Sequence, residues 1–207
     1  MDIAIIGAGN VGTALATAFA RAGHHVTISA THPEHAARVA EATGTGAART
    51  NQEAIAAGDV VILAVPGTAF DDIAGEVGAE LAGKVVVDVS NRPTPDPSGP
   101  GTSAAEELQA RIPNAPVVKA FNTAFASRQA DPTVDGIPAD GFVAGDDDEA
   151  KGTVLDLVES IGFRPVDAGS LAAARTLEGM AWLNINRAMQ GGTWQDAWVI
   201  LGPDSRS

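Results

Sequence analysis

Apolar residues along this chain follow two alternating patterns. Near-continuous runs of β-branched and other apolar residues occur at 2–6, 25–29, 59–65, 84–90 and 115–121. The stretches between them predict helices at 10–22, 33–42, 68–82 and about 102–111, and a short strand is a candidate at 46–50. Runs without polar alternation are typical of strands covered on both faces. The alternation of strands and helices therefore predicts an α/β fold with a doubly wound, mostly parallel sheet.

The last third of the chain continues this rhythm after two interruptions. Strands are predicted at 141–145 and 164–169, and helices at about 147–161 and 170–189. The segment 91–101 contains four prolines and, like 126–141, is expected to be a loop. Long loops beside the carboxyl ends of strands often carry function, and plain surface connections are the alternative.

The acidic run at 145–150 is a possible metal cluster, but we interpret it as the start of a helix. Asp146 is then the expected N-cap, and the following carboxylates favour the positive end of the helix. No metal site is predicted.

The most informative motif is a glycine-rich loop, IIGAGNVGTAL, at residues 5–15. It follows a strand and opens a helix, which is the context that makes G-x-G-x-x-G a dinucleotide-binding motif. Gly7 permits the tight turn, Gly9 leaves room for a diphosphate beside the backbone, and Gly12 lets the helix pack closely on the strand. We therefore predict a Rossmann-type dinucleotide-binding domain at 1–125, with a small C-terminal α/β extension packed on it at 126–207.

The end of the second strand favours NADP over NAD. NAD enzymes usually carry Asp or Glu there, whereas this chain reads ISATHPE at 28–34. Ser29 and Thr31 can donate hydrogen bonds to a 2′-phosphate, and His32 can become cationic beside one, unless it is simply a solvated loop residue. Arg38, further along the next helix, is a weaker candidate.

Two further segments are candidates for contact with the cofactor. Ala64, Val65 and Pro66 end the fourth predicted strand and would pass near a ribose at the switch point of the sheet. Asn91 follows the fifth strand and would reach the nicotinamide side. A plain turn at the first segment and capping of the Pro-rich loop by Asn91 are the alternatives.

Composition narrows the range of partners. The 207 residues include 26 Asp and Glu against 13 Lys and Arg, for a net charge of −13, which disfavours nucleic acid and anionic membranes as partners. Cysteine is absent, so thiolate chemistry is excluded, and Tyr is absent too. No signal peptide or membrane span is recognisable, so we expect a cytoplasmic protein.

Longer stretches of the sequence resemble a known family. The stretches are IAIIGAGNVGTALATAFARAGHHVTISATHPEHA, VVKAFNTAF, GDDDEAKGTVLDLVESIGFRPVDAGSL and AAARTLEGMAWLNIN. They resemble the coenzyme F420-dependent NADP oxidoreductases, and also the cytoplasmic reductase domains of certain membrane ferric reductases.

This resemblance implies roles for three groups of residues. The diphosphate is expected at Gly7, Ala8, Gly9, Asn10 and Val11. The 2′-phosphate is expected at Ser29, Ala30, Thr31 and His32. The nicotinamide and the deazaflavin are expected to meet near Ala120, Phe121, Asn122, Thr123 and Ala124. Two positions depart from the family: Ala30-Thr31 stands where many members carry Ser-Arg, and Asn122 stands where archaeal reductases carry His.

The predicted reaction is hydride transfer between NADP(H) and a small-molecule acceptor, the deazaflavin coenzyme F420 or a flavin as co-substrate. Because the cofactors carry the reactivity, the fold supplies mainly distance, orientation and exclusion of water. Asn122 and Thr123 are the predicted catalytic residues, which orient the acceptor. Lys119 is expected to face outward on its strand rather than to donate a proton.

Alternatives to this reaction stay open. The chain could be an NADP(H)-binding redox-sensing module without turnover, or a ferric or flavin reductase-like domain. A hydroxyacid or pyrroline-carboxylate reductase is disfavoured, because such enzymes need a large helical domain after the nucleotide domain. The stripe Trp182, Ile185 and Met189 on the last helix is interpreted as core or dimer contact, and with the family resemblance it predicts a homodimer.

Overall fold

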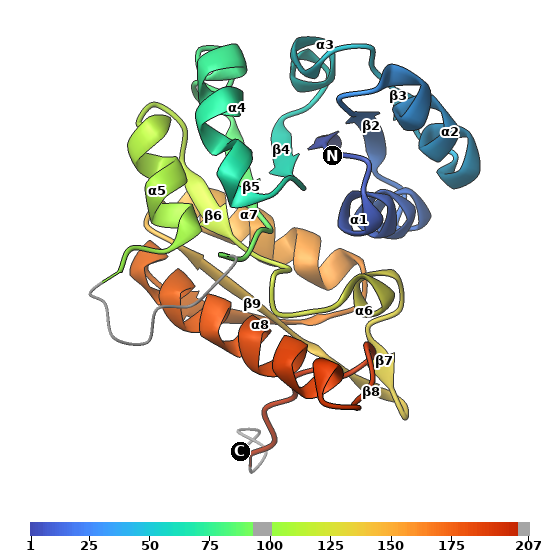
Figure 1. Cartoon of the computed structure of the whole chain (residues 1–207), viewed down its shortest axis with the longest axis vertical. Helices are drawn as coiled ribbons and strands as arrows, with labels where there is room; N and C mark the ends of the chain where they lie inside the picture. The colour runs from blue at the N-terminus through green and yellow to red at the C-terminus, as the bar shows by residue number, and fades with distance from the viewer. Residues whose placement is uncertain (93–100, 203–207) are drawn as a thin grey trace.

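The computed structural model describes residues 1–92 and 101–202, and its main feature is an eight-stranded sheet. The strand order is β10-β9-β6-β5-β4-β1-β2-β3 (Figure 1). The strands are β1 (Asp2–Ile6), β2 (His25–Ser29), β3 (Gly46–Ala47), β4 (Val60–Leu63), β5 (Val85–Asp88), β6 (Val117–Lys119), β9 (Asp140–Gly145) and β10 (Arg164–Gly169). All neighbours pair in parallel except β6 and β9, which are antiparallel. The predicted doubly wound, mostly parallel sheet is confirmed.

Helices cover both faces of the sheet, so the molecule has three layers. One buried apolar cluster joins the sheet to α1 (Asn10–Arg21), α2 (Pro33–Thr43) and α7 (Asp148–Ser160). A second cluster on the opposite face joins it to α3 (Asn51–Ala56), α4 (Phe70–Val77), α5 (Ala104–Arg111) and α8 (Ala174–Met189). Burial on both faces explains why the strands read as uninterrupted apolar runs.

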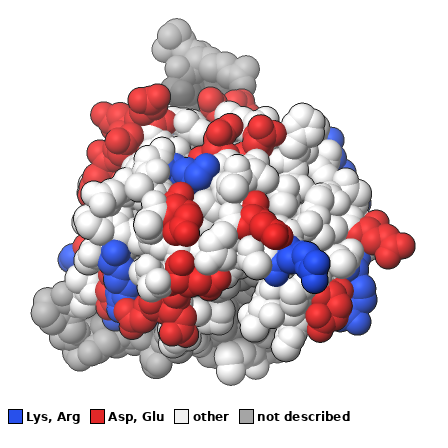
Figure 2. Space-filling view, turned by 90° about the horizontal axis from the view of Figure 1, so that it is seen from above, with Lys and Arg blue, Asp and Glu red and all other residues white. Residues whose placement is uncertain are grey.

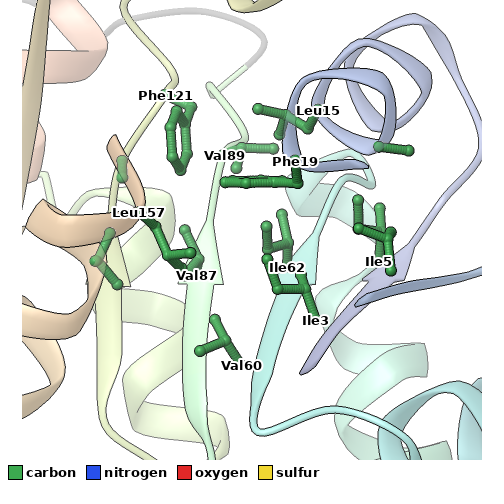
Figure 3. Close-up of a cluster of buried hydrophobic side chains, with 14 of the residues drawn as sticks. Ile3, Ile5, Leu15, Phe19, Val60, Ile62, Val87, Val89, Phe121 and Leu157 are labelled. Atoms are coloured by element: carbon green, nitrogen blue, oxygen red, sulfur yellow. The ribbon is translucent and has the colours of Figure 1, made fainter. Parts of the chain in front are cut away.

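The first cluster fixes α1 against the centre of the sheet. Figure 3 shows Leu15 and Phe19 of α1 lying over Ile5 of β1 and Ile62 of β4. Phe121, two residues after the end of β6, packs edge-on against Phe19 with their ring centroids 5.8 Å apart. The start of α1 is thereby held close to the segment that follows β6.

The direction of winding reverses between β1 and β4. Ile3 of β1 aligns with Val26 of β2 on one side and with Val60 of β4 on the other. In open parallel sheets, ligands bind in the crevice at the carboxyl ends of the strands where the order reverses. The glycine-rich loop and residues 64–66 lie on the two sides of this point.

The segment 126–141 is more regular than expected, so the loop prediction was wrong there. It contains α6 (Ala126–Ala130) and a hairpin of β7 (Thr133–Val134) and β8 (Ile137–Pro138). Asp135 and Gly136 at its tip have φ angles of 50° and 80°. Two consecutive left-handed residues of the type Asp-Gly form the tight turn that suits a two-residue hairpin.

The expected N-cap of the helix after the acidic run was wrong by one residue. Asp147, not Asp146, caps α7 by accepting a hydrogen bond from the Ala150 N–H, whereas Asp146 accepts from the Leu171 N–H. Asp146 therefore ties the start of α7 to the segment before α8. Most of the predicted Pro-rich loop, 93–100, lies outside the described residues.

The strands of the predicted C-terminal extension continue the main sheet through the antiparallel β6–β9 pair. The division into 1–125 and 126–207 stays a prediction. Among the described residues, no helix is both long and apolar enough to cross a membrane.

Candidate functional site

The glycine-rich loop is tightly packed at two of its three glycines. Gly7 has a φ of +109°, and a Cβ there would lie 2.4 Å from the Ala64 carbonyl oxygen. A Cβ on Gly12 would lie 1.9 Å from the Gly7 carbonyl oxygen. No side chain fits at either position without moving the backbone, so these two glycines shape the loop itself.

Gly9 differs, because a Cβ there would meet no protein atom within 4 Å. Gly9 is the N-cap of α1, with no side-chain cap and no acidic residue in the first turn. The first N–H groups of a helix have no intrahelical partner, and they carry the positive end of the helix dipole. The space beside Gly9 therefore fits an anionic group such as a diphosphate.

A pocket of about 280 Å³ adjoins this loop at the ends of β1, β2 and β4. Its lining includes predicted site residues: Gly7, Ala30, Thr31 and Val65. It also includes residues that the sequence pattern did not indicate: Asn51, the first residue of α3, and Asp72, Ile73 and Glu76 of α4. The helices that follow β3 and β4 thus form a wall that strand patterns alone do not reveal.

Ser29 is buried, and its hydroxyl is already engaged. It donates a 2.8 Å hydrogen bond to Asn51 Oδ1, and Asn51 Nδ2 donates to Glu76 Oε2 at 3.1 Å. This chain of bonds fixes the carboxyl end of β2 to α3 and α4. Ser29 therefore shapes the pocket rather than presenting a free donor to it.

The remaining predicted residues of this end are not among the lining residues of the pocket. His32 and Arg38 are exposed, and His32 Nδ1 lies 3.8 Å from Glu34 Oε1. Pro66 precedes the 3-10 turn Gly67–Ala69, and Ala64 packs against the loop at Gly7 and Gly12. Ala8 is buried, and Asn10 is exposed at the start of α1.

A second pocket, of about 130 Å³, lies at the other end of the loop. It brings together Val11, Asn91, Asn122, Thr123 and Ala124, all predicted from the sequence. Ala181, Asn184 and Ile185 of α8 complete the wall. Ile185, which was interpreted as core or dimer contact, is thus also a lining residue of this pocket. Trp182 is half-buried and donates to the Arg92 carbonyl oxygen, while Met189 is exposed.

Asn91 and Asn122 form a reciprocal pair in this pocket. Asn122 Nδ2 donates to Asn91 Oδ1 at 2.9 Å, and Asn91 Nδ2 donates to the Asn122 carbonyl oxygen at 3.3 Å. The buried Asn122 Oδ1 has no hydrogen-bond partner among the described residues. A buried acceptor without a partner is unfavourable, so this atom suits a ligand that donates an N–H.

The backbone of this segment is strained and braced. Phe121 has a φ of 61°, which is rare outside glycine, and such strain often accompanies functional segments. The Gln129 side chain donates to the carbonyl oxygens of Phe121 and Ala124, and Asn184 donates to that of Thr123. Ala120 and Phe121 are buried, so their side chains support Asn122 from the core.

Lys119 was expected to face outward, and this was wrong. Its side chain is fully buried, with Nζ 2.8 Å from Asp88 Oδ2 and 2.9 Å from Glu178 Oε1. Strand alternation predicted an exposed cation, but both faces of β6 are covered. The buried ammonium group is instead paired with two carboxylates from distant segments.

Acidic side chains outnumber basic ones in this chain, and the surface reflects this. Figure 2 shows Asp and Glu side chains spread over one face, with fewer Lys and Arg among them. The described residues contain no group of three or more His, Asp or Glu side chains placed to hold a metal ion.

Comparisons with known proteins identify relatives of this chain. Residues 2–92 match the family model described as NADP oxidoreductase, coenzyme F420-dependent. The F420-dependent NADP reductase of Methanothermobacter marburgensis is 33% identical over 209 residues, which cover 90% of this chain and 92% of that protein. A crystal structure of a putative F420-dependent NADP reductase from Arthrobacter sp. FB24 superposes with a TM-score of 0.86 at 28% identity, covering 98% of this chain and 100% of that chain.

Another relative is a larger protein. Metalloreductase STEAP3 of Rattus norvegicus is 33% identical over 184 residues, which cover 85% of this chain. The chain spans only 35% of the length of that metalloreductase.

Proposed function

This chain belongs to the family of coenzyme F420-dependent NADP oxidoreductases, and we propose that it transfers a hydride between NADP(H) and a deazaflavin or flavin acceptor. NADPH supplies the hydride, and the oxidised acceptor takes it up together with one proton. The chain's own residues bind, align and enclose the two molecules.

The observation that carries this proposal is the placement of two pockets on one loop. Gly7 lines the larger pocket and Val11 lines the smaller one, with the N-terminus of α1 between them. A dinucleotide with its diphosphate beside Gly9 and its adenosine in the larger pocket directs its nicotinamide towards the smaller one. This arrangement favours a redox role over binding of the adenosine half alone.

The smaller pocket supplies orientation rather than acid–base chemistry. Asn122 Oδ1 accepts an N–H from the nicotinamide amide or from the acceptor ring, while Asn91 holds the Asn122 amide in place. Thr123 is fixed through its carbonyl oxygen by Asn184. Ala181 and Ile185 exclude water from the space between them.

NADP preference, in this proposal, depends on Arg49. The parallel register pairs Thr27 with Gly46 and Ile28 with Ala47, and the Ala48 N–H donates to the Ile28 carbonyl oxygen. Arg49 follows β3 by two residues, and β3 lies beside β2, so we expect Arg49 to lie near Ala30. Arg49 is exposed and forms no ion pair with a described residue. It supplies the cation that Ala30-Thr31 lacks.

The acidic wall of the larger pocket fits this orientation. Asp72 and Glu76 lie on the α4 side, where carboxylates accept hydrogen bonds from an adenine amino group and repel a phosphate. The 2′-phosphate is then directed to the β2–α2 side, towards Arg49 and His32.

The test is a spectrophotometric assay with purified protein and NADPH. Coenzyme F420, FMN, FAD and a ferric chelate are offered separately, and oxidation of NADPH is followed at its absorbance band. Reduction of coenzyme F420 or a flavin supports the proposal, and reduction of the ferric chelate alone supports a ferric reductase-like domain. Tight NADPH binding without turnover of any acceptor contradicts the proposal and favours a redox sensor.

A homodimer and a cytoplasmic location stay predictions. Leu183, Met189 and Trp194 are large apolar side chains that are 51%, 71% and 55% exposed, which supports an interface on α8 and the segment after it. Light scattering coupled to gel filtration measures the mass. A monomer at micromolar concentration contradicts the dimer.

A further inference from the structure

We propose that the buried ionic cluster of Asp88, Lys119 and Glu178 positions the walls of the smaller pocket, where the acceptor is proposed to bind. This inference deepens the proposed hydride transfer and rests on it for its kinetic consequence. None of the three residues lines the pocket, so each is a positioning residue that acts through its neighbours.

The cluster is enclosed and closely bonded. The side chains of Lys119 and Asp88 are 0% exposed, and that of Glu178 is 7% exposed. Lys119 Nζ donates to Asp88 Oδ2, to Glu178 Oε1 and, at 2.5 Å, to the Ser90 carbonyl oxygen. All three donors of the ammonium group are therefore used, which fixes its orientation.

Each residue bonded in the cluster lies close in sequence to a residue that lines the pocket. Ser90, whose N–H also donates to Asp88 Oδ1, directly precedes Asn91. Lys119 lies three residues before Asn122 on the same segment. Ala181 and Asn184 are one and two turns beyond Glu178 on α8. The cluster thus sets the relative positions of the ends of β5 and β6 and of α8.

Glu178 also reaches a fourth element. Its Oε1 accepts a hydrogen bond from the Ala104 N–H at the start of α5, at 2.9 Å. Nearer the surface, Arg175 of α8 pairs with Glu106 of α5. Helix α8 is therefore held at two successive turns before it reaches the pocket.

An ionic cluster suits this task because its geometry is directional. Apolar side chains tolerate sliding of a helix, whereas a buried charge that loses its partner is strongly unfavourable. Two carboxylates share one ammonium group here, so loss of Lys119 leaves two like charges facing each other. Loss of the Glu178 charge leaves the Lys119–Asp88 pair but weakens the hold on α8.

The experiment compares Glu178→Gln and Lys119→Met with the wild type and with Arg111→Met. Gln keeps the shape and an acceptor atom for Ala104, so Glu178→Gln is expected to fold even if Lys119→Met does not. Arg111 pairs with Asp71 on the surface and serves as the matched loss of an ion pair elsewhere. Single-turnover stopped-flow kinetics with NADPH and its 4-deuterated form measures hydride transfer, and titration measures NADPH affinity.

For Glu178→Gln we expect hydride transfer to slow about 10- to 100-fold, because small misplacements of reacting groups have effects of this size. NADPH affinity should change less than about threefold, and Arg111→Met should behave as wild type. Equal rates of hydride transfer in wild type and folded Glu178→Gln overturn the proposal.

Hydrogen–deuterium exchange on the protein without nucleotide gives a readout that does not require turnover. Residues 88–92, 119–125 and 178–186 should exchange faster in Glu178→Gln, while residues 5–15 stay unchanged. Uniformly faster exchange indicates a general stability role and overturns the positioning role. If the wild type reduces no acceptor, the proposed function fails, but the exchange pattern still tests the positioning of the pocket.

Discussion

Replacement of Gly9 by Val separates nucleotide binding from folding. Gly9 has an extended backbone, with φ −75° and ψ −170°, which any residue adopts. A Cβ there meets no protein atom, so the side chain enters only the space beside the start of α1. The folded protein should therefore persist while the anion-binding space is filled.

The expected magnitudes follow from these contacts. Blocking two charge-assisted hydrogen bonds from N–H groups to the diphosphate costs about 3–6 kcal/mol, at about 1.5–3 kcal/mol each. This corresponds to a rise in the dissociation constant of NADPH of about 10²- to 10⁴-fold. The free energy of unfolding should fall by no more than about 1 kcal/mol, which is the order of the preference for Gly over Val at an N-cap.

Isothermal titration with NADPH and thermal unfolding of the protein without ligand measure the two effects. Gly152→Val is the matched control, because a Cβ at this position of α7 also meets nothing within 4 Å. Gly12→Ala is the opposite case, since its Cβ would lie 1.9 Å from the Gly7 carbonyl oxygen and should destabilise the loop. Unchanged NADPH affinity in folded Gly9→Val would refute the placement of the diphosphate.

Three other predictions address separate parts of the molecule. Arg49→Ala should weaken the binding of NADPH about tenfold and leave the binding of NADH unchanged. Thr31→Arg should strengthen the binding of NADPH relative to that of NADH by about 1–2 kcal/mol. If the ratio of the two affinities is unchanged in both variants, the 2′-phosphate lies elsewhere. Asn122→Leu should slow hydride transfer more than it weakens NADPH binding, and equal losses would contradict an orienting role. The hydrogen bond from Arg175, with help from the N-cap of α5, lowers the pKa of Glu106 from 4.5 to about 2. Because this folded-state pKa is depressed, the stability that ionised Glu106 contributes is present above pH 4.5 and lost as the pH falls towards 2. The difference in unfolding free energy between wild type and Glu106→Gln should shrink over that range, and a constant difference would contradict the pairing.

Many of the strands were predictable because burial on both faces of the sheet requires uninterrupted runs of apolar residues. The runs at 60–63 and 85–87 have no polar position to obscure them, and the glycine loop follows from backbone requirements at Gly7 and Gly12. Short elements such as α6 leave little mark, because five residues do not complete a periodic pattern. Boundaries set by side-chain caps also depend on which of several neighbouring carboxylates turns towards the helix, as at Asp146 and Asp147.

The burial of Lys119 could not be predicted from local pattern. Its partners lie 31 and 59 residues away in the chain, and only the folded sheet brings them together. A lysine in an otherwise apolar strand reads equally as an outward-facing residue or as one half of a buried pair. The same holds for Ile185 and Asn184, whose role appears only when α8 crosses the ends of β5 and β6.

The two pockets are formed by different parts of the chain. This difference concerns which acceptor the protein reduces. The described residues that line the larger pocket all lie within 2–92, the range matched by the family model. The smaller pocket takes Val11 and Asn91 from that range, but its other described lining residues lie at 122–126 and on α8. Relatives can therefore keep the dinucleotide end while the acceptor end changes. We expect exchanges at Ile185 to alter which acceptor is reduced with little effect on NADPH affinity, because Ile185 lines the smaller pocket from α8 and is not among the residues of the larger pocket.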